Sequence, residues 1–445
     1  MTYKLPYNIR FNIDSLLKFV LHIDSFWYVH VVSAFPLAHH SLLIRFDASD
    51  ILIQVNFFVF LNINTRKMKK QLPFIKEDAM KTFDHLINEI QAPGRCHHCG
   101  GCVTFCTAIN YGALKLDEDG KPVFKDSDKC IECGICYMVC PEIDELEEEI
   151  KKQVQWSPPN GRIIGFDVSR AKDPFVLEKG TDGGVVTSLL LHLFDIGFID
   201  GAIVTKQIGM HRQPWLAASR EDIIEAAGSH FDTMHGLASL GDHYSTYSPS
   251  ILGLDSALRG SLNRIAMVGT PCQIKSARKM QAYGIVPSDS IKYYLGLFCT
   301  SSFRFDEEKW KRVEDLGDFK TDAVKKVNIK DEFLIHLKNG EVKRISLDEL
   351  SFAKREACNY CDDFSAEFAD ISFGGIGAEM GWTTVVIRTP LGKAIFEGAS
   401  NSVLERYKSV DNPKFATHAM EKVMSSSDRK RVMAEIKLQK LKMNL

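Results

Sequence analysis

The cysteines constrain this chain more than any other feature. The 445 residues include twelve cysteines, and all twelve fall into three sets of four. Two sets are compact runs with the same spacing, C-x2-C-x2-C-x3-C: Cys96, Cys99, Cys102 and Cys106, then Cys130, Cys133, Cys136 and Cys140. Cysteine thiolates at this spacing suit iron–sulfur clusters.

A doubled run of this kind is typical of bacterial two-cluster ferredoxins, in which the fourth cysteine of each run binds the other cluster. We therefore predict one 4Fe-4S cluster at Cys96, Cys99, Cys102 and Cys140, and a second at Cys130, Cys133, Cys136 and Cys106. The intervening segment GALKLDEDGKPVF predicts two short strands around an Asp119-Gly120 turn. Paired zinc knuckles are the alternative, but such sites come as two separated C-x2-C pairs. Thr107 departs from the pattern, which usually has a proline there.

The third set is scattered along the chain: Cys272, Cys299, Cys358 and Cys361. Residues 264–268 and 291–298 are short and apolar, which predicts two buried strands, with a helix over 273–283 between them. In a strand–helix–strand unit the strands are parallel, so Cys272 and Cys299 would emerge at the same edge of the sheet. The spacing alone leaves three possibilities open: a third cluster, a structural zinc, or inert buried thiols.

A glycine pair precedes an apolar helix in TDGGVVT, residues 181–187. Asp182 can cap this helix, while Gly183 and Gly184 leave its first N–H groups uncovered for a phosphate. The alternative is a tight loop without a ligand. A flavin is expected on chemical grounds, because clusters carry single electrons whereas hydride donors give two. The dinucleotide fingerprint is missing, since GGIGAEMG at 374–381 lacks its spacing.

Residues 156–399 contain five motifs in a fixed order: TDGGVVTSLL, GTPCQ, GLFC, CNYCDDFSAEFADISFGG and GWTTVVIRT. In these motifs the chain resembles the beta-subunit family of coenzyme F420 hydrogenases and dehydrogenases. The resemblance implies that Cys272, Cys299, Cys358 and Cys361 hold a third 4Fe-4S cluster beside an FAD. Together with the ferredoxin run, the chain is similar to the electron-input subunits of F420H2 dehydrogenases.

Coenzyme F420 carries a phosphate and a glutamate tail, so its pocket should present cations. Lys275 is a candidate, and Arg278 and Lys279 are weaker ones that also fit the solvated face of an amphipathic helix. Arg388 and Lys206, at strand ends, are further candidates. The residues predicted to contact the flavin or the coenzyme are Thr181, Asp182, Gly183, Gly184, Thr187, Gly269, Thr270 and Lys275.

The resulting hypothesis is an oxidoreductase that transfers hydride between coenzyme F420 and FAD and passes single electrons through three 4Fe-4S clusters. No catalytic acid, base or nucleophile is expected, because hydride transfer depends on stacking the two rings and excluding water. The expected partner is a membrane oxidoreductase complex, a heterodisulfide reductase, a hydrogenase or a soluble ferredoxin. Two alternatives stay open: a flavin and iron–sulfur reductase of another organic substrate, and an electron-transfer subunit without hydride chemistry.

Composition limits the partners and the cellular compartment that we expect. A formal charge of −2 argues against a nucleic-acid partner. Cysteines reserved for clusters imply a reducing cytoplasm, with attachment at the periphery of a membrane complex as an option.

The predicted fold class is α+β, with a bacterial-type two 4Fe-4S ferredoxin domain over residues 68–155 and a mixed α/β flavin and 4Fe-4S domain over 156–445. The linker 156–161, WSPPNG, is expected to space the two domains. Residues 1–67 are expected to be an extension that is not translated, because Met68 would make an ordinary start. A membrane anchor is the alternative. The tail 428–445 predicts a solvated terminal helix in preference to a membrane-surface or partner-docking helix.

Overall fold

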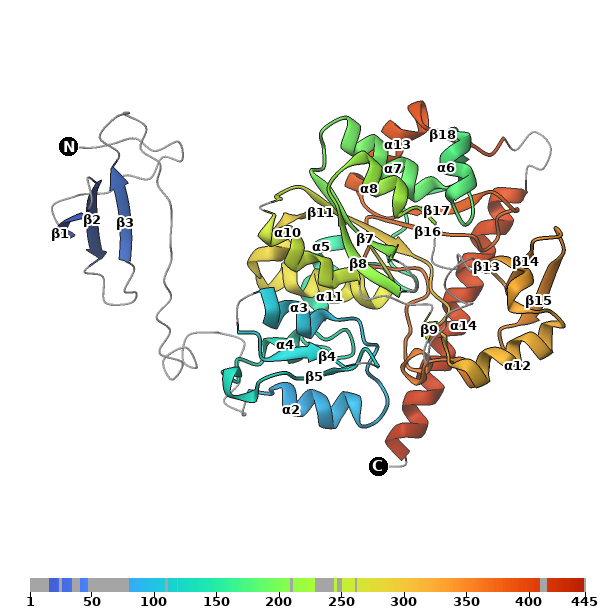
Figure 1. Ribbon diagram of the computed structural model, residues 1–445, viewed down its shortest axis with the longest axis horizontal. Coiled ribbons are helices and arrows are strands. Elements are labelled where there is room, and N and C mark those ends of the chain that lie inside the picture. The colour runs from blue at the N-terminus through green and yellow to red at the C-terminus, as the bar shows by residue number, and fades with distance from the viewer. Residues whose placement is uncertain are drawn as a thin grey trace. The chain divides into compact units, whose positions relative to one another are not determined.

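The computed structural model describes residues 16–23, 26–33, 41–46 and 80–443, with gaps at 109–110, 118, 209–210, 229–243, 246–249, 261 and 409–413. It divides into two compact units, Met1–Ala79 and Met80–Leu445 (Figure 1). The first unit contains an antiparallel sheet of β1 (Leu16–Ile23), β2 (Phe26–Ser33) and β3 (Ser41–Phe46). The start predicted at Met68 lies outside the described residues. No helix in the described ranges is both long and apolar enough to cross a membrane.

The second unit begins with the ferredoxin domain. Its elements are α2 (Phe83–Leu86), η2 (Ile87–Gln91), α3 (Gly101–Ala108), β4 (Leu114–Leu116), β5 (Pro122–Phe124), η3 (Ser127–Lys129), α4 (Ile135–Met138) and α5 (Glu147–Val154). The predicted hairpin is confirmed, because β4 and β5 pair antiparallel. Gly120 takes a φ of 73° in the turn, a left-handed conformation that suits glycine.

An eight-stranded mixed sheet forms the centre of the rest, in the order β18-β6-β17-β16-β11-β10-β7-β8. The predicted strands and helix are confirmed as β10 (Ile265–Gly269), α11 (Pro271–Tyr283) and β11 (Ile291–Leu297), and the two strands are parallel. The parallel run extends to β7 and β16, and the outer pairs are antiparallel. The remaining strands are β6 (Gly165–Ala171), β7 (Gly201–Ile208), β8 (His211–Ala217), β16 (Ile371–Gly374), β17 (Thr383–Ile387) and β18 (Leu404–Arg406).

Helices cover both faces of this sheet. One face, with Ala202 and Ala266, packs against α6 (Pro174–Lys179), α7 (Val185–Asp195), α8 (Arg220–Glu225) and α13 (Pro390–Ser402). The other face, with Ile203 and Met267, packs against α10 (Gly253–Arg259) and α11, and the ferredoxin domain continues the same apolar core. The second unit is therefore layered: helices, the central sheet, further helices and the ferredoxin domain follow one another in that order (Figure 1). Short 3₁₀ segments lie at η4 (Ser250–Leu252), η5 (Val286–Ser290), η6 (Thr321–Ala323), η7 (Ser351–Ala353) and η8 (Glu356–Asn359).

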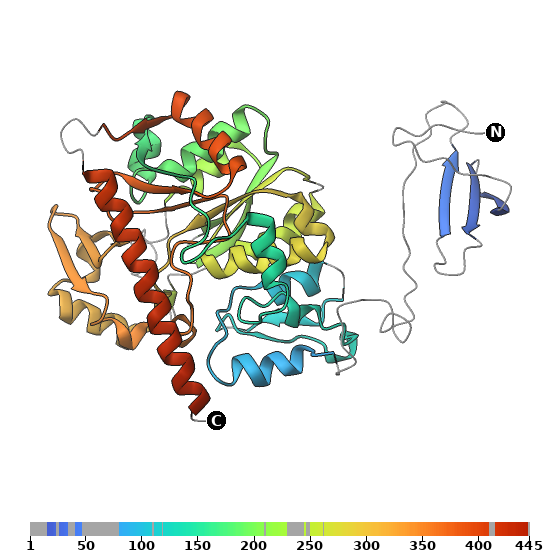
Figure 2. The same cartoon turned by 180° about the vertical axis from the view of Figure 1, so that it is seen from behind.

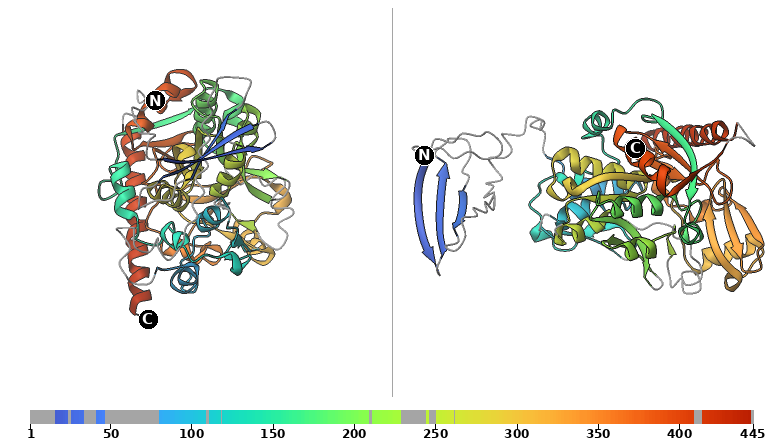
Figure 3. Two further views of the ribbon diagram at one scale, coloured as in Figure 1. Left: turned by 90° about the vertical axis from the view of Figure 1, so that its left-hand side faces the viewer. Right: turned by 90° about the horizontal axis from the view of Figure 1, so that it is seen from above.

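A second, smaller sheet stands beside the central one (Figure 3). It consists of β13 (Val324–Ile329), β14 (Glu332–Leu337) and β15 (Val342–Ser346), and it confirms the predicted hairpin around Asn339-Gly340. Its core includes Trp310 of α12 (Glu307–Gly317). Nearby, β9 (Tyr244–Ser245) pairs with β12 (Arg304–Phe305).

Helix α11 joins the ferredoxin domain to the sheet. Ser276 Oγ donates to the carbonyl of Val139 at 2.9 Å, and Lys279 Nζ donates to the carbonyl of Cys140 at 2.9 Å. Lys279 is 0% exposed and Arg278 is 7% exposed, so the expectation that both lie on a solvated helix face is wrong. Their charges are turned inward because this face of α11 is an intramolecular contact.

Two further expectations concern the linker at 156–161 and the C-terminal tail. Trp156, the first residue of the predicted spacer, donates from Nε1 to Glu367 Oε2 at 2.8 Å, so the ferredoxin lies directly against its neighbour. The tail forms α14 (Phe415–Met443), which buries Phe415, Ala419, Val423, Ser427 and Ala434. Four of these five residues precede the predicted tail. Within 428–443 Ala434 is the one buried residue and the others are exposed or half-buried, so the predicted solvated helix is confirmed there. Figure 2 shows α14 running along the rear of the domain.

Gly101 provides a test of the domain contact. A Cβ at Gly101 would lie 2.0 Å from Ser276 Oγ, so Gly101→Ala should force α3 away from α11. We expect a destabilisation of about 1–3 kcal/mol, the usual cost of overpacking, measured by anaerobic thermal unfolding of the full chain. Gly398→Ala is the matched control, because its Cβ would meet its nearest atom at 3.4 Å inside α13. That variant should be neutral or slightly stabilised; equal melting temperatures for the two variants would contradict the contact.

Candidate functional site

A cavity of about 270 Å³ lies at the carboxyl edge of the parallel strands. Its lining includes the last residues of β10 and β11, Gly269 and Leu297, together with Phe373 and Gly374 of β16. Ligands of open α/β sheets characteristically bind outside the carboxyl ends of parallel strands. The cavity therefore occupies the position where the fold itself favours a binding site.

The glycine-pair loop forms one wall of this cavity. Thr181, Asp182, Gly184 and Thr187 line it, and Gly184 is the N-terminal cap of α7 with a left-handed φ of 67°. No side chain caps this helix, so the first N–H groups of α7 are left for another acceptor. The prediction that Asp182 caps α7 is wrong, because its carboxylate is held elsewhere.

Asp182 belongs to a contact between the loop and the small second sheet. Its Oδ1 accepts from Asn328 Nδ2 at 3.1 Å and pairs with Lys330 Nζ at 3.2 Å. Asn328 and Lys330 also line the cavity, and Lys330 is the one lysine or arginine among the lining residues that the structure describes. Sequence reasoning missed both residues, because neither lies in a motif and both come from a separate sheet.

The GTPC segment forms the opposite wall. Gly269 and Thr270 line the cavity, and the N–H of Thr270 donates to Gln273 Oε1 at 2.9 Å in a capping box that begins α11. Six of the eight predicted contact residues thus lie on one cavity. Gly183 is not in the lining, since its N–H donates to Thr383 Oγ1 at 3.0 Å.

The predicted cations lie away from the cavity. Lys275 pairs with Glu147 at 2.7 Å; burial alone would lower the pKa of Lys275, but Glu147 and Asp362 hold it above its usual value. Arg278 pairs with Asp370 at 3.1 Å, and Lys206 pairs with Glu225. Arg388 is buried and donates to the carbonyl of Asn160 at 3.0 Å. These four side chains hold the fold together.

The ferredoxin cysteines line two small cavities in the crossed arrangement. One of about 30 Å³ is lined by Cys96, Cys99, Cys102 and Cys140, and one of about 20 Å³ by Cys106, Cys130, Cys133 and Cys136. Burial raises the pKa of the Cys140 thiol to about 12. Bare thiolates are therefore disfavoured in these cavities, whereas thiolates bound to iron would be neutralised, which fits the donor set to 4Fe-4S clusters.

The third set of cysteines also comes together. Cys272 lies in the first turn of α11, Cys299 follows β11, and Cys358 lies in η8 three residues before Cys361. Burial raises the pKa of the Cys299 thiol to about 12; Lys430 opposes this shift, while the thiolates of Cys358 and Cys272 add to it. Burial raises the pKa of Cys361 as well, again with a contribution from Cys272. Within the described ranges, no three His, Cys, Asp or Glu side chains converge on a single metal ion.

The cavity and the cysteine sets follow one another through the molecule. Cys299 belongs both to the third set and to the lining of the large cavity. Burial raises the pKa of Cys99, and the thiolate that contributes most to the shift is that of Cys272. Cys136 contributes in the same way to the raised pKa of Cys102. The order is therefore large cavity, third set, then the two ferredoxin sets.

Comparisons with known proteins agree with this arrangement. Residues 262–412 match the C-terminal part of the family described as coenzyme F420 hydrogenase/dehydrogenase, beta subunit, and residues 168–241 match the N-terminal part of the same family. Residues 88–141 match the 4Fe-4S dicluster domain.

Individual relatives come from Methanosarcina barkeri and Methanocaldococcus jannaschii. The chain is 30% identical over 293 residues to the coenzyme F420 hydrogenase subunit beta of Methanosarcina barkeri, covering 64% of this chain and 91% of that protein. It is 31% identical over 331 residues to the coenzyme F420-dependent sulfite reductase of Methanocaldococcus jannaschii, covering 70% of this chain but only 47% of the reductase.

A solved structure is also similar. A chain in the F420-reducing NiFe hydrogenase complex from Methanosarcina barkeri aligns with a TM-score of 0.51 and 28% identity, covering 62% of this chain and 93% of that one. The present chain therefore belongs to the coenzyme F420 hydrogenase/dehydrogenase beta-subunit family, and it carries a 4Fe-4S dicluster ferredoxin domain ahead of the family module.

Proposed function

We propose that this chain transfers hydride between coenzyme F420 and an FAD in the large cavity and conducts single electrons through three 4Fe-4S clusters. The observation that carries the proposal is the uninterrupted order of sites. Cys299 lines the cavity, the charge of Cys272 raises the pKa of Cys99, and the charge of Cys136 contributes to the raised pKa of Cys102. A two-electron site next to one-electron sites is the arrangement that hydride oxidation by a cluster protein requires.

The residues of the cavity suit a flavin nucleotide. The open N-terminus of α7 offers N–H groups to a phosphate, and Lys330 supplies a cation in the same lining. Apolar side chains, among them Leu190, Ile223 and Phe373, form the remaining wall. When bound, FAD supplies the exchange between hydride and single electrons. Lys275 has no part in this proposal, because it does not line the cavity.

The electron partner would meet the ferredoxin domain at its outer set. Cys130 and Cys133 are half-buried, and Ile131 between them is 43% exposed. A relative of this chain is part of an F420-reducing hydrogenase complex. A hydrogenase, a membrane oxidoreductase complex, a heterodisulfide reductase or a soluble ferredoxin would each serve as the acceptor or the donor at this surface.

The donor can be tested directly. Full-length protein purified without oxygen should contain flavin and iron, and reduced F420 should bleach its flavin and cluster absorption while NADH leaves it unchanged. A fully loaded protein that does not bleach would contradict the F420 reaction and leave a reductase of another organic substrate. Loaded clusters without any flavin would instead indicate an electron-transfer subunit.

Lys330 tests the flavin position. Lys330→Met removes the cation from the cavity lining, and we expect FAD to bind about tenfold more weakly, equivalent to about 1.4 kcal/mol. The measurement is FAD retained after equilibrium dialysis. Lys338→Met is the control, because Lys338 is exposed on the same small sheet and donates to the carbonyl of Asp322. Equal FAD retention in the two variants would place the phosphates elsewhere.

The crossed cysteine assignment makes a separate prediction. Cys106→Ser should alter the same paramagnetic signal as Cys133→Ser, because these residues line one cavity, and Cys140→Ser should alter the same signal as Cys99→Ser. Electron paramagnetic resonance of the dithionite-reduced full chain is the measurement. If Cys106→Ser grouped with Cys99→Ser instead, each run would bind its own cluster and the crossed assignment would fail.

A further inference from the structure

Helix α14 brings a lysine to the third cysteine set. The helix spans Phe415–Met443 and so lies beyond residues 262–412, which match the family. Lys430 Nζ donates to the backbone carbonyl of Cys299. The thiolates of Cys361, Cys299 and Cys358 raise the pKa of Lys430, although burial acts to lower it. A cation from the end of the chain therefore contacts Cys299 and interacts electrostatically with three of the four cysteines.

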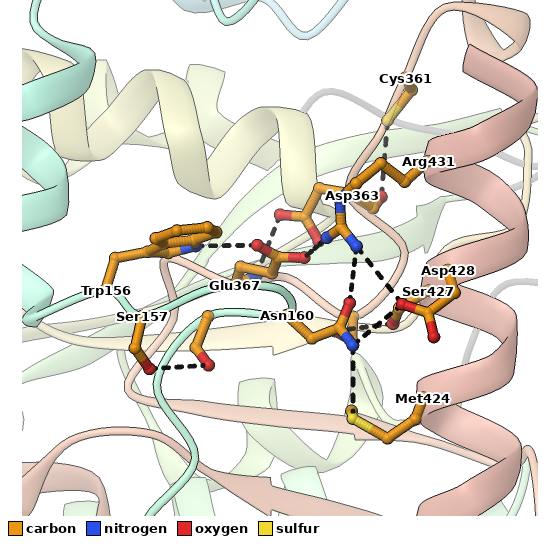
Figure 4. Close-up of polar contacts among 12 residues, drawn as sticks. Trp156, Ser157, Asn160, Cys361, Asp363, Glu367, Met424, Ser427, Asp428 and Arg431 are labelled. Carbon is orange, nitrogen blue, oxygen red and sulfur yellow. Dashed lines mark hydrogen bonds and ion pairs between the residues drawn. The ribbon is translucent and has the colours of Figure 1, made fainter. Parts of the chain in front are cut away.

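A polar network fixes α14 in the register that places Lys430 there (Figure 4). Arg431, the next residue, donates to Glu367 Oε1 at 2.6 Å and to Asn160 Oδ1 at 2.8 Å. Asn160 in turn donates to Asp428 Oδ1 of α14 at 3.2 Å. The helix is thus tied to the segment around residue 160 on both sides of Lys430.

The same network reaches the segment that follows the C-x2-C pair. The N–H of Glu367 donates to Asp363 Oδ2 at 2.9 Å, and Cys361 Sγ donates to the carbonyl of Asp363 at 3.5 Å. Figure 4 shows Arg431 and Glu367 beside this segment. A shift of α14 would therefore move both Lys430 and the backbone that carries Cys361.

The charge at this position has an electrostatic consequence. A 4Fe-4S cluster held by four thiolates is anionic, and each electron it accepts adds one negative charge. Inside a protein the attraction between a fixed cation and that charge is much stronger than in water. A nearby buried ammonium therefore stabilises the reduced form of a cluster and raises its reduction potential.

Other charges near the set do not replace this one. Asp362 and Asp363 act against Lys430, because their charges contribute to the raised pKa of Cys361 whereas that of Lys430 lowers it. Asp363 Oδ1 has no hydrogen-bond partner among the described residues. Lys354 is a second lysine whose charge interacts with Cys358 and Cys361. Lys430 is the lysine with a hydrogen bond to a backbone carbonyl of the set.

We propose that the charge of Lys430 on α14 raises the reduction potential of the third cluster, so that this cluster accepts electrons readily from the cavity that Cys299 lines. The inference rests on the proposed function, because it requires a cluster at Cys272, Cys299, Cys358 and Cys361. It adds to that function a control on electron entry by a helix outside the family match.

The test is a redox titration of the full-length, cluster-loaded chain, followed by electron paramagnetic resonance. Lys430→Gln keeps a donor but removes the charge, and Lys430→Arg keeps the charge. Lys440→Gln removes an equal charge from an exposed position on the same helix and is the control. Cys361→Ser identifies which signal belongs to the third cluster. Only molecules that hold the cluster give the signal, so partial loading of a variant does not prevent the measurement.

In Lys430→Gln we expect the third cluster to be harder to reduce by at least a tenfold change in its one-electron equilibrium, about 59 mV. Lys430→Arg and Lys440→Gln should titrate like the parent protein. An unchanged potential in Lys430→Gln would overturn the proposal, and so would an equal shift in Lys430→Arg, which would indicate a purely structural contact.

Iron content separates this result from failure of the proposed function. Three clusters require about twelve iron atoms per chain, and two require about eight. About eight iron atoms, with every signal unaffected by Cys361→Ser, would remove the third cluster itself. Twelve iron atoms with no shift in Lys430→Gln would leave the electron path intact and remove only the role of Lys430.

Discussion

The contact between helix α11 and the ferredoxin loop is the interaction on which the rest of the arrangement depends. One end of α11 carries Thr270 and Cys272 to the large cavity and to the third cysteine set. Its middle holds the ferredoxin through Ser276 and Lys279, which donate to the carbonyls of Val139 and Cys140. A single rigid helix therefore sets the separation between the third set and the first ferredoxin set. Electron transfer between clusters falls steeply with distance, so this contact is a functional constraint as well as a packing one.

The sequence predicted those parts of the site that depend on local spacing. The cysteine runs predicted a crossed grouping that the two small cavities display, because the distance between residues in a run fixes how the chain wraps around a cluster. The strand, helix and strand around Cys272 were also predictable, since apolar runs and a Pro-containing first turn are local signals. The position of Cys272 and Cys299 at the carboxyl edge of the sheet then followed, because the two strands of such a unit are parallel.

What the sequence could not predict depends on contacts between distant segments. Asp182 looked like a helix cap, but its partners Asn328 and Lys330 lie about 150 residues later, on a sheet with no motif. Lys279 looked like a solvated charge on an amphipathic helix, yet it is fully buried because the ferredoxin covers that face. Lys430 lies in a tail whose basic composition favoured a solvated helix, and its acceptor is the carbonyl of Cys299. A charged residue that would be solvated on an isolated helix is buried when another domain covers it. The periodicity of one helix carries no information about that other domain.

Lys279 and Lys430 share one arrangement, in which an ammonium group donates to the backbone carbonyl of a cysteine, Cys140 in one case and Cys299 in the other. Burial, reinforced by the charge of Lys275, lowers the pKa of Lys279 to about 8, so the folded chain bears a cost for keeping this cation charged. A buried ammonium is costly unless anions compensate it. Anionic clusters in the adjacent cysteine sets would supply that compensation, just as the lysines would stabilise added electrons. Cluster binding and the folding of the domain contact are then linked, because each lowers the free energy of the other. The same two lysines would therefore couple assembly of the electron path to its redox properties.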